Sequence, residues 1–111
     1  MRDISKADWK LFRERIGEWQ EAYMAKLNRE YVTLLTGDGH ASEKFWALKE
    51  RIRKDKNTPG VRLELKKSEV DWNLITLMRD GVITAEGLDG FSEELKEYVI
   101  RRAEYRYDDE D

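Results

Sequence analysis

Residues 5–36 read SKADWKLFRERIGEWQEAYMAKLNREYVTLLT, and apolar side chains recur in this stretch at steps of three or four. The recurring positions are Phe12, Ile16, Trp19, Tyr23, Leu27, Tyr31 and Leu34. This spacing places them on one stripe of an α-helix. Ser5, followed three residues later by Asp8, has the pattern of a helix N-cap. The sequence therefore predicts one long N-terminal helix.

The length of this helix poses a packing problem. A helix over 5–36 would be about 48 Å long, whereas a compact domain of 111 residues has a diameter of about 34 Å. The helix must therefore overhang its own globule, bend near Gly17, or pack against a second copy of the chain. An overhang would expose the apolar stripe to water. We therefore expect a bend or a homodimer.

A second helix is predicted over about 43–56, with Ser42 as its N-cap and with Phe45, Leu48 and Ile52 on its buried face. Residues 61–66 then alternate apolar and charged side chains, which is typical of a half-buried strand. No second strand is predicted to pair with it. We expect either an extended segment packed on helices or an edge that pairs with another copy.

The last third of the chain predicts two more helices and a short helical turn. Ser68 is expected to cap a helix over about 69–80, whose apolar residues cover most of its circumference and should make it the most buried element. Thr84 is expected to cap a short helical turn through Leu88, and Ser92 is expected to start a final helix to about residue 106. We expect Leu95, Val99 and Ala103 to face inward and residues 107–111 to form a frayed acidic tail. The predicted fold is a mainly α domain of four to five helices, with a short extended segment near 61–66.

Length and composition exclude several classes of protein. The chain has 111 residues, no cysteine, four tryptophans and a net charge of −3. It offers no apolar run of about 18 residues and no signal-peptide pattern. Its aromatic content argues against disorder. We expect residues 1–111 to form one soluble, cytoplasmic domain that does not enter a membrane.

Catalytic and metal-binding patterns are also missing from the sequence. The single histidine, His40, lies between Asp38 and Ser42, but a triad needs groups brought together from separate elements. One histidine without cysteine cannot fill a zinc site, and the glycines match no phosphate-binding loop. The interpretation is a polar turn between helices. We expect no enzyme activity, no cofactor and no metal.

Charge is distributed unevenly along the chain. Residues 43–67 hold nine basic and four acidic residues, net +5, whereas residues 86–111 hold four basic and ten acidic residues, net −6. The basic block either pairs with the acidic C-terminal helix or is exposed to a partner. Exposed, it could follow a phosphate backbone. The candidate partner surface consists of Trp9, Trp46, Lys49, Arg51, Arg53, Lys54 and Lys56.

Several segments carry resemblances to known families. Residues 4–13, 44–46, 51–56, 59–61, 80–84 and 91–96 resemble a family of small helical proteins from gut Firmicutes, some of which are labelled multidrug transporters. The absence of an apolar span argues against that label here. Residues 77–86 are similar to the short C-terminal helical hairpin module, which implies an oligomerisation or interaction element. The chain departs from that module at Gly87 and at Asp89-Gly90, which interrupt the second helix.

These patterns together favour a non-enzymatic protein-interaction or oligomerisation module, with a homodimer as one expected assembly. The alternative is a nucleic-acid-associated accessory protein that uses the basic segment 43–67.

Overall fold

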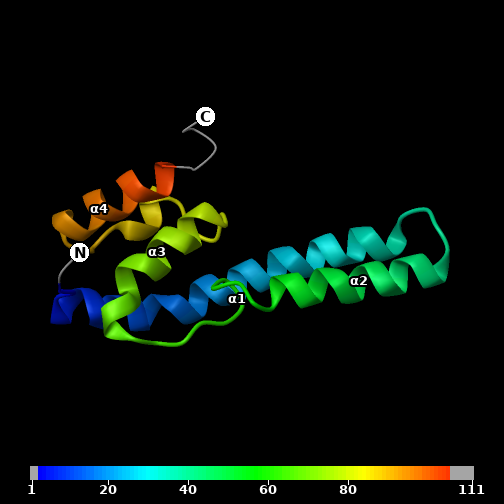
Figure 1. Cartoon of the computed structure of the whole chain (residues 1–111), viewed down its shortest axis with the longest axis horizontal. Coiled ribbons are helices and arrows are strands. Elements are labelled where there is room, and N and C mark those ends of the chain that lie inside the picture. The colour runs from blue at the N-terminus through cyan, green and yellow to red at the C-terminus, as the bar shows by residue number, and fades with distance from the viewer. Residues whose placement is uncertain (1–2, 106–111) are drawn as a thin grey trace.

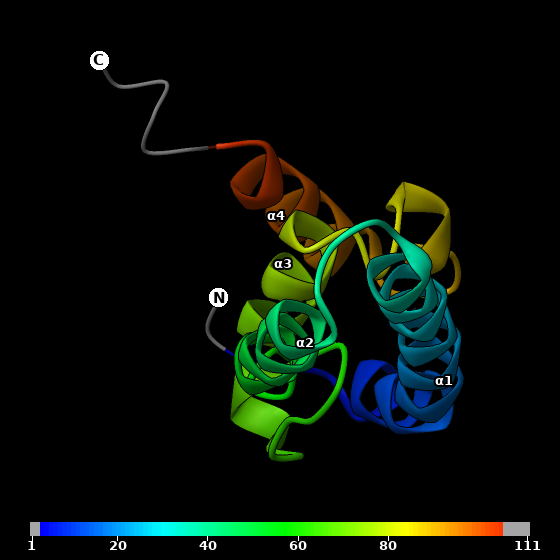
Figure 2. The same ribbon diagram turned by 90° about the vertical axis from the view of Figure 1, so that its right-hand side faces the viewer.

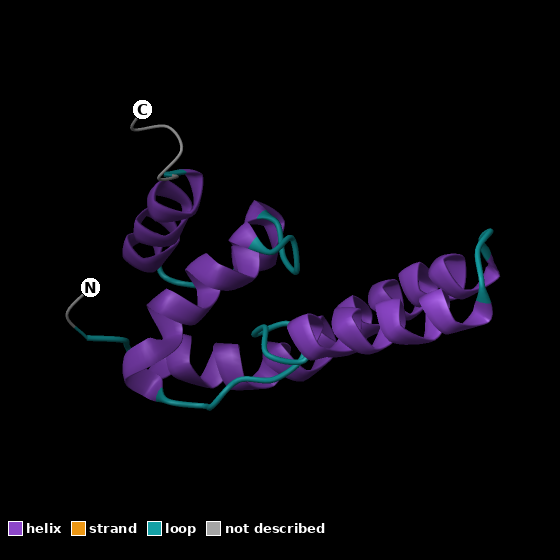
Figure 3. Cartoon of the chain, turned by 45° about the vertical axis from the view of Figure 1, so that its right-hand side comes forward, coloured by secondary structure: helices purple, strands orange, loops and turns teal. Residues whose placement is uncertain are grey.

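The computed structural model describes residues 3–105, and every regular element in this range is helical (Figure 3). The α-helices are α1 (Lys6–Thr36), α2 (Ala41–Asp55), α3 (Val70–Arg79) and α4 (Glu93–Glu104). Two short 3-10 turns, η1 (Lys67–Glu69) and η2 (Ala85–Leu88), precede and follow α3. The predicted mainly α fold with a long N-terminal helix is confirmed.

The helices form two parts, which Figure 1 shows side by side along the longest axis. The body consists of residues 4–22 and 67–105, and the arm consists of residues 24–55, in which α2 runs back alongside the second half of α1 (Figure 2). The molecule extends 51 × 37 × 22 Å and has a radius of gyration of 16.5 Å. A compact chain of this length would have a radius of about 13 Å. The arm therefore projects from the body.

This arrangement corrects the expected bend. α1 continues as one helix through Gly17 and extends beyond the body. This overhang is the alternative that we disfavoured. On the predicted stripe, Phe12, Ile16 and Leu27 are buried and the remaining positions are half-buried. The stripe is thus covered by the body near its N-terminal end and by α2 in the arm, so that no bend is required.

The body is built around a core between α1, α3 and α4. Phe12 from α1, Leu74 and Leu77 from α3, and Leu95 and Val99 from α4 are fully buried in it. The expectation that the third helix is the most buried one is confirmed, since half of α3 lies in the interior. The inward positions predicted for α4 are confirmed as well.

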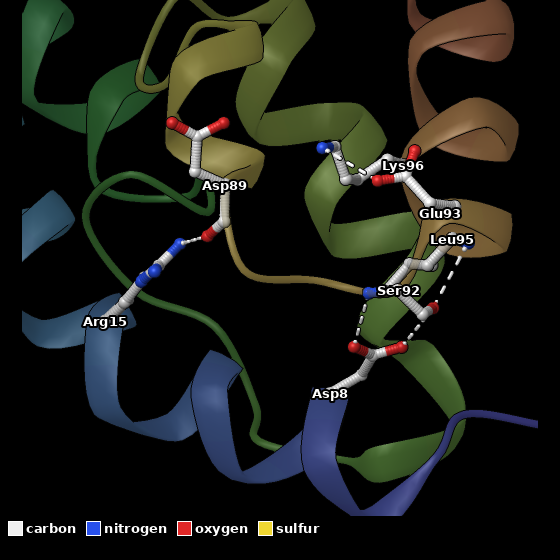
Figure 4. Close-up of polar contacts among 7 residues, drawn as sticks. All are labelled: Asp8, Arg15, Asp89, Ser92, Glu93, Leu95 and Lys96. Atoms are coloured by element: carbon white, nitrogen blue, oxygen red, sulfur yellow. Dashed lines mark hydrogen bonds and ion pairs between the residues drawn. The ribbon is translucent and has the colours of Figure 1, made fainter.

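A buried carboxylate joins the first turn of α1 to the first turn of α4 (Figure 4). Asp8 is 4% exposed and accepts hydrogen bonds from the Ser92 backbone N–H at 2.9 Å and from the Ser92 hydroxyl at 2.7 Å. The Ser92 hydroxyl oxygen in turn accepts from the Leu95 N–H, and Ser5 caps α1 by accepting from the Asp8 N–H. The predicted caps at Ser5 and Ser92 are confirmed, and Asp8 connects them.

The other two predicted serine caps are wrong. α2 begins at Ala41, with His40 at the N-cap position and no side-chain cap bond, so that Ser42 lies inside the first turn. Ser68 lies within η1, and Glu69 takes the position before α3. Helical backbone begins one residue before each serine: α2 starts at Ala41, and the 3-10 turn η1 starts at Lys67, where the Glu69 N–H donates to the Lys66 carbonyl at 3.0 Å.

The segment 61–66 does not form a strand within the described residues. Leu63 packs against the core while Leu65 is half exposed, so the segment is the extended connection packed on helices that was one of the two expectations. The expected acidic tail, residues 107–111, lies outside the described residues.

The connection that follows α2 passes very close to Tyr23 and Val82 at Gly60. A Cβ atom at this position would lie 2.4 Å from a Tyr23 ring carbon and 2.7 Å from a Val82 methyl group. Gln20 also donates a side-chain hydrogen bond to the Pro59 carbonyl at 2.9 Å. Absence of a side chain at Gly60 thus allows the connection from α2 to pass close to α1.

Candidate protein-interaction surface on the arm

A polar cluster fastens α2 to α1 in the arm. The Tyr31 hydroxyl donates to an Asp55 carboxylate oxygen at 2.6 Å, and the Arg51 guanidinium donates to Glu30 at 2.8 Å. Arg51 also lies 3.5 Å from the same Asp55 oxygen and stacks over the Tyr31 ring at 5.5 Å. Burial raises the pKa of the Tyr31 phenol to about 12, and the hydrogen bond to Asp55 and the charge of that carboxylate add to the shift.

This cluster decides which side of α2 faces solvent. Arg51 and Asp55 stand four residues apart, hence on one side of the helix, and both face α1. The apolar stripe lies on a neighbouring side of α2. Phe45 is 62% exposed and Ile52 is 42% exposed, so the prediction that Phe45, Leu48 and Ile52 form a buried face is wrong for both of these residues. Leu48 is half-buried.

The exposed stripe continues across the end of the arm as a shallow groove. One hollow of about 360 Å³ is lined by Phe45, Leu48 and Ile52 together with Lys49, Arg53 and Lys56. A second hollow of about 560 Å³ shares Phe45 and Leu48 and reaches Leu35 of α1. Leu35 is 43% exposed. We call the four apolar residues Leu35, Phe45, Leu48 and Ile52 the arm groove.

Cations border the arm groove. Lys44, Lys49 and Lys56 line it, and the ion pairs among residues 3–105 include none of these three ammonium groups. Lys49 instead lies over the Trp46 ring at 5.2 Å. Arg53 differs, because Glu50 accepts two hydrogen bonds from it at 2.7 and 2.9 Å, and these bonds lower the pKa of Glu50. The groove therefore carries three cations without a partner carboxylate in this range.

The residues that the sequence predicts as a partner surface do not all lie together in the structure. Trp46, Lys49, Arg53 and Lys56 lie on the outer side of α2, and Lys54 is exposed elsewhere on the same helix. Arg51 faces α1 in the polar cluster instead. Trp9 is half-buried against the body core, with Arg13 over its ring at 5.0 Å, so it lies apart from the arm.

The part of the basic block in α2 and the acidic C-terminal helix lie at different ends of the molecule. Figure 1 shows α4 on the body, away from the length of α2. The ion pairs of the basic segment reach Glu30, Glu50, Asp55 and Glu64. Of the two alternatives left open by the charge pattern, the described residues favour exposure of the basic segment over pairing with α4.

A third hollow lies on the body between α3 and α4. It measures about 630 Å³, and its lining includes Trp72, Tyr98, Arg79 and Arg102. Trp72 is 58% exposed, which sequence reasoning missed because the apolar residues of α3 were expected to cover most of its circumference. Arg79 donates to the carbonyls of Arg102 and Tyr105 at the end of α4, and Arg102 stacks on Tyr98 at 3.9 Å. Arg79 and Arg102 are therefore engaged in contacts with the C-terminal part of α4.

The residues that could bind a metal ion are scattered in the described part of the chain. Residues 3–105 contain no group of three or more histidine, aspartate or glutamate side chains placed to hold a metal ion. His40 lies at the N-cap position of α2, at the tip of the arm. Among the same residues, no helix combines the length and apolar character needed to cross a bilayer.

Comparisons of this chain with protein-family models, with curated proteins and with solved structures found no match. The two resemblances noted in the sequence therefore stay predictions.

Proposed function

We propose that this chain is a non-enzymatic protein-interaction module that binds its partner through the arm groove. The observation that carries this proposal is the orientation of α2, which directs Phe45 and Ile52 to solvent although α1 lies alongside. Contiguous exposed apolar side chains on a small protein mark interaction surfaces, because leaving them in water is unfavourable. Aromatic anchors at such surfaces commonly contribute most of the binding energy.

Two polar contacts between α1 and α2 support the proposal. The Tyr31–Asp55 and Arg51–Glu30 bonds fix α2 on α1, so the groove is formed before any partner arrives. A preformed surface loses less conformational entropy on binding than a mobile one. In this proposal the protein acts in the cytoplasm, as the sequence predicts.

A specific observation also keeps nucleic acid as the second candidate. Lys49 lies over the exposed Trp46 ring, Lys44 and Lys56 line the same groove as Lys49, and cations beside an aromatic ring are typical of single-strand binding surfaces. The apolar residues between these lysines favour a protein partner, because a phosphate backbone has no apolar surface to bury against them.

Site-specific photo-cross-linking tests the proposal. A benzophenone amino acid replaces Phe45, one aromatic side chain for another at an exposed position, and a matched variant carries it at the exposed Glu14 in the body. After irradiation in native lysate, we expect a discrete protein adduct from position 45 that is absent from position 14. Equal labelling at both positions, or a nucleic-acid adduct alone, would overturn the proposal. An adduct of twice the chain mass would identify the partner as a second copy.

A further inference from the structure

The exposed side of α2 has the dimensions of a helix-binding groove. Phe45, Leu48 and Ile52 follow one another at steps of three and four, so they lie in one row along α2. Leu35 extends the row across the tip of the arm. The length from Ala41 to Lys56 corresponds to about 22 Å of helix axis. A partner helix of about four turns would cover it, with apolar anchors at i, i+3 or i+4, and i+7.

The lysines beside this row determine which charge the side chains of a bound partner should carry. Lys44 lies beside the hollow near the tip, and Lys49 and Lys56 follow the row of apolar residues toward the body. Carboxylates on a docked helix would reach these ammonium groups at the border of the interface, where solvent remains. Such complementarity raises the association rate and rejects partners of the wrong sign more than it adds affinity.

A second copy of the chain fits this surface poorly. Packing two arm grooves together would bring the lysines of one copy against those of the other. The body does offer an exposed acidic side on α4, at Glu93, Glu94 and Glu97, but that side has no row of free apolar anchors, because the apolar residues of α4 are buried in the core or packed against it. The partner must therefore come from a different chain.

We propose that the arm groove binds an amphipathic helix of another protein, one whose apolar anchors are flanked by acidic residues. This inference rests on the proposed function and specifies its partner class.

Fluorescence anisotropy with a synthetic peptide tests the partner class. The probe is a fluorescein-labelled helical peptide of about 15 residues, with leucine at the anchor positions and glutamate on both flanks. One control peptide has lysine in place of every glutamate, and the other has serine in place of every leucine. We expect the glutamate peptide to bind the full chain at least about tenfold more tightly than either control.

Variants of the protein make the test specific to the arm groove. In the charge-reversed variant Lys44→Glu/Lys49→Glu/Lys56→Glu, the preference should switch to the lysine peptide. In Phe45→Ser/Ile52→Ser, affinity should fall about tenfold or more. Lys10→Glu, a charge reversal on the body, should change neither affinity, since the Lys10 side chain is 73% exposed and lies away from the arm. Far-UV circular dichroism checks that each variant keeps its helices.

The outcomes separate this inference from the proposed function. The inference is overturned if the glutamate and lysine peptides bind equally, if Lys10→Glu acts like the triple variant, or if no peptide binds. It is also overturned if a single-stranded oligonucleotide binds more tightly than the glutamate peptide at physiological salt. In these cases a protein adduct from position 45 would still support an interaction module with a different partner class. Absence of that adduct would remove the proposed function itself.

Discussion

Two phenylalanines in different parts of the molecule should respond very differently to truncation. Phe12 lies in the body core at 0% exposure, whereas Phe45 lies on the arm at 62% exposure. Both belong to α-helices, so replacement by alanine changes helix propensity by the same amount in each. The pair Phe12→Ala and Phe45→Ala therefore isolates the effect of burial.

The structure sets the expected size of each effect. Removing a fully buried phenylalanine side chain leaves a cavity and lowers the free energy of unfolding by about 3–5 kcal/mol. Burying a whole phenylalanine side chain contributes about 1.5–3 kcal/mol, and Phe45 keeps only the covered part of its surface. Its truncation should therefore cost no more than about 1 kcal/mol, less a few tenths gained from the helix propensity of alanine.

Equilibrium urea unfolding followed by far-UV circular dichroism measures both values. The measurement is repeated at two protein concentrations, because a dimer would make the stability depend on concentration. A loss above about 2 kcal/mol for Phe45→Ala would show that the side chain is buried within one chain, as the sequence first indicated. If that loss appeared only at the higher concentration, a second copy would be covering the arm groove.

Three further changes have defined outcomes. Gly17→Ala should raise the free energy of unfolding by about 1 kcal/mol in urea titrations, since Gly17 lies inside α1 with open space around it; a decrease would show that the helix needs glycine there. Gly60→Ala should lower the free energy of unfolding by about 1–3 kcal/mol, because the added methyl group meets the Tyr23 ring, and an unchanged value would contradict that contact. In an ultraviolet phenolate titration, the difference between wild type and Tyr31→Phe should show a group with a pKa of about 12. Because the folded-state pKa lies above the ordinary value of 10.0, the stability contributed by Tyr31 is present below pH 10.0 and is lost as the pH rises toward 12; a difference spectrum that titrates near 10.0 would refute this.

Sequence reasoning located most helices because their signals are local. The stripe from Phe12 to Leu34 and the caps at Ser5 and Ser92 involve residues within a few positions of one another. The buried positions of α4 follow from the same periodicity. Such features form wherever the helix forms, so a single sequence reveals them.

The exposure of the apolar side of α2 could not be predicted from such local patterns. A row of apolar residues such as Phe45 and Ile52 indicates a face that favours burial, and the chain need not bury it against itself. The orientation of α2 depends on Tyr31 meeting Asp55, 24 positions along the chain. Asp8 likewise meets Ser92 across 84 positions. These polar contacts have no periodic signature in the sequence.

The arm groove as a binding surface is tested most directly by nuclear magnetic resonance of the ¹⁵N-labelled full chain titrated with the glutamate peptide. Chemical-shift changes confined to residues 32–36 and 44–56 are the result that we predict. Changes centred on α3 or α4, or no changes at all, would contradict it.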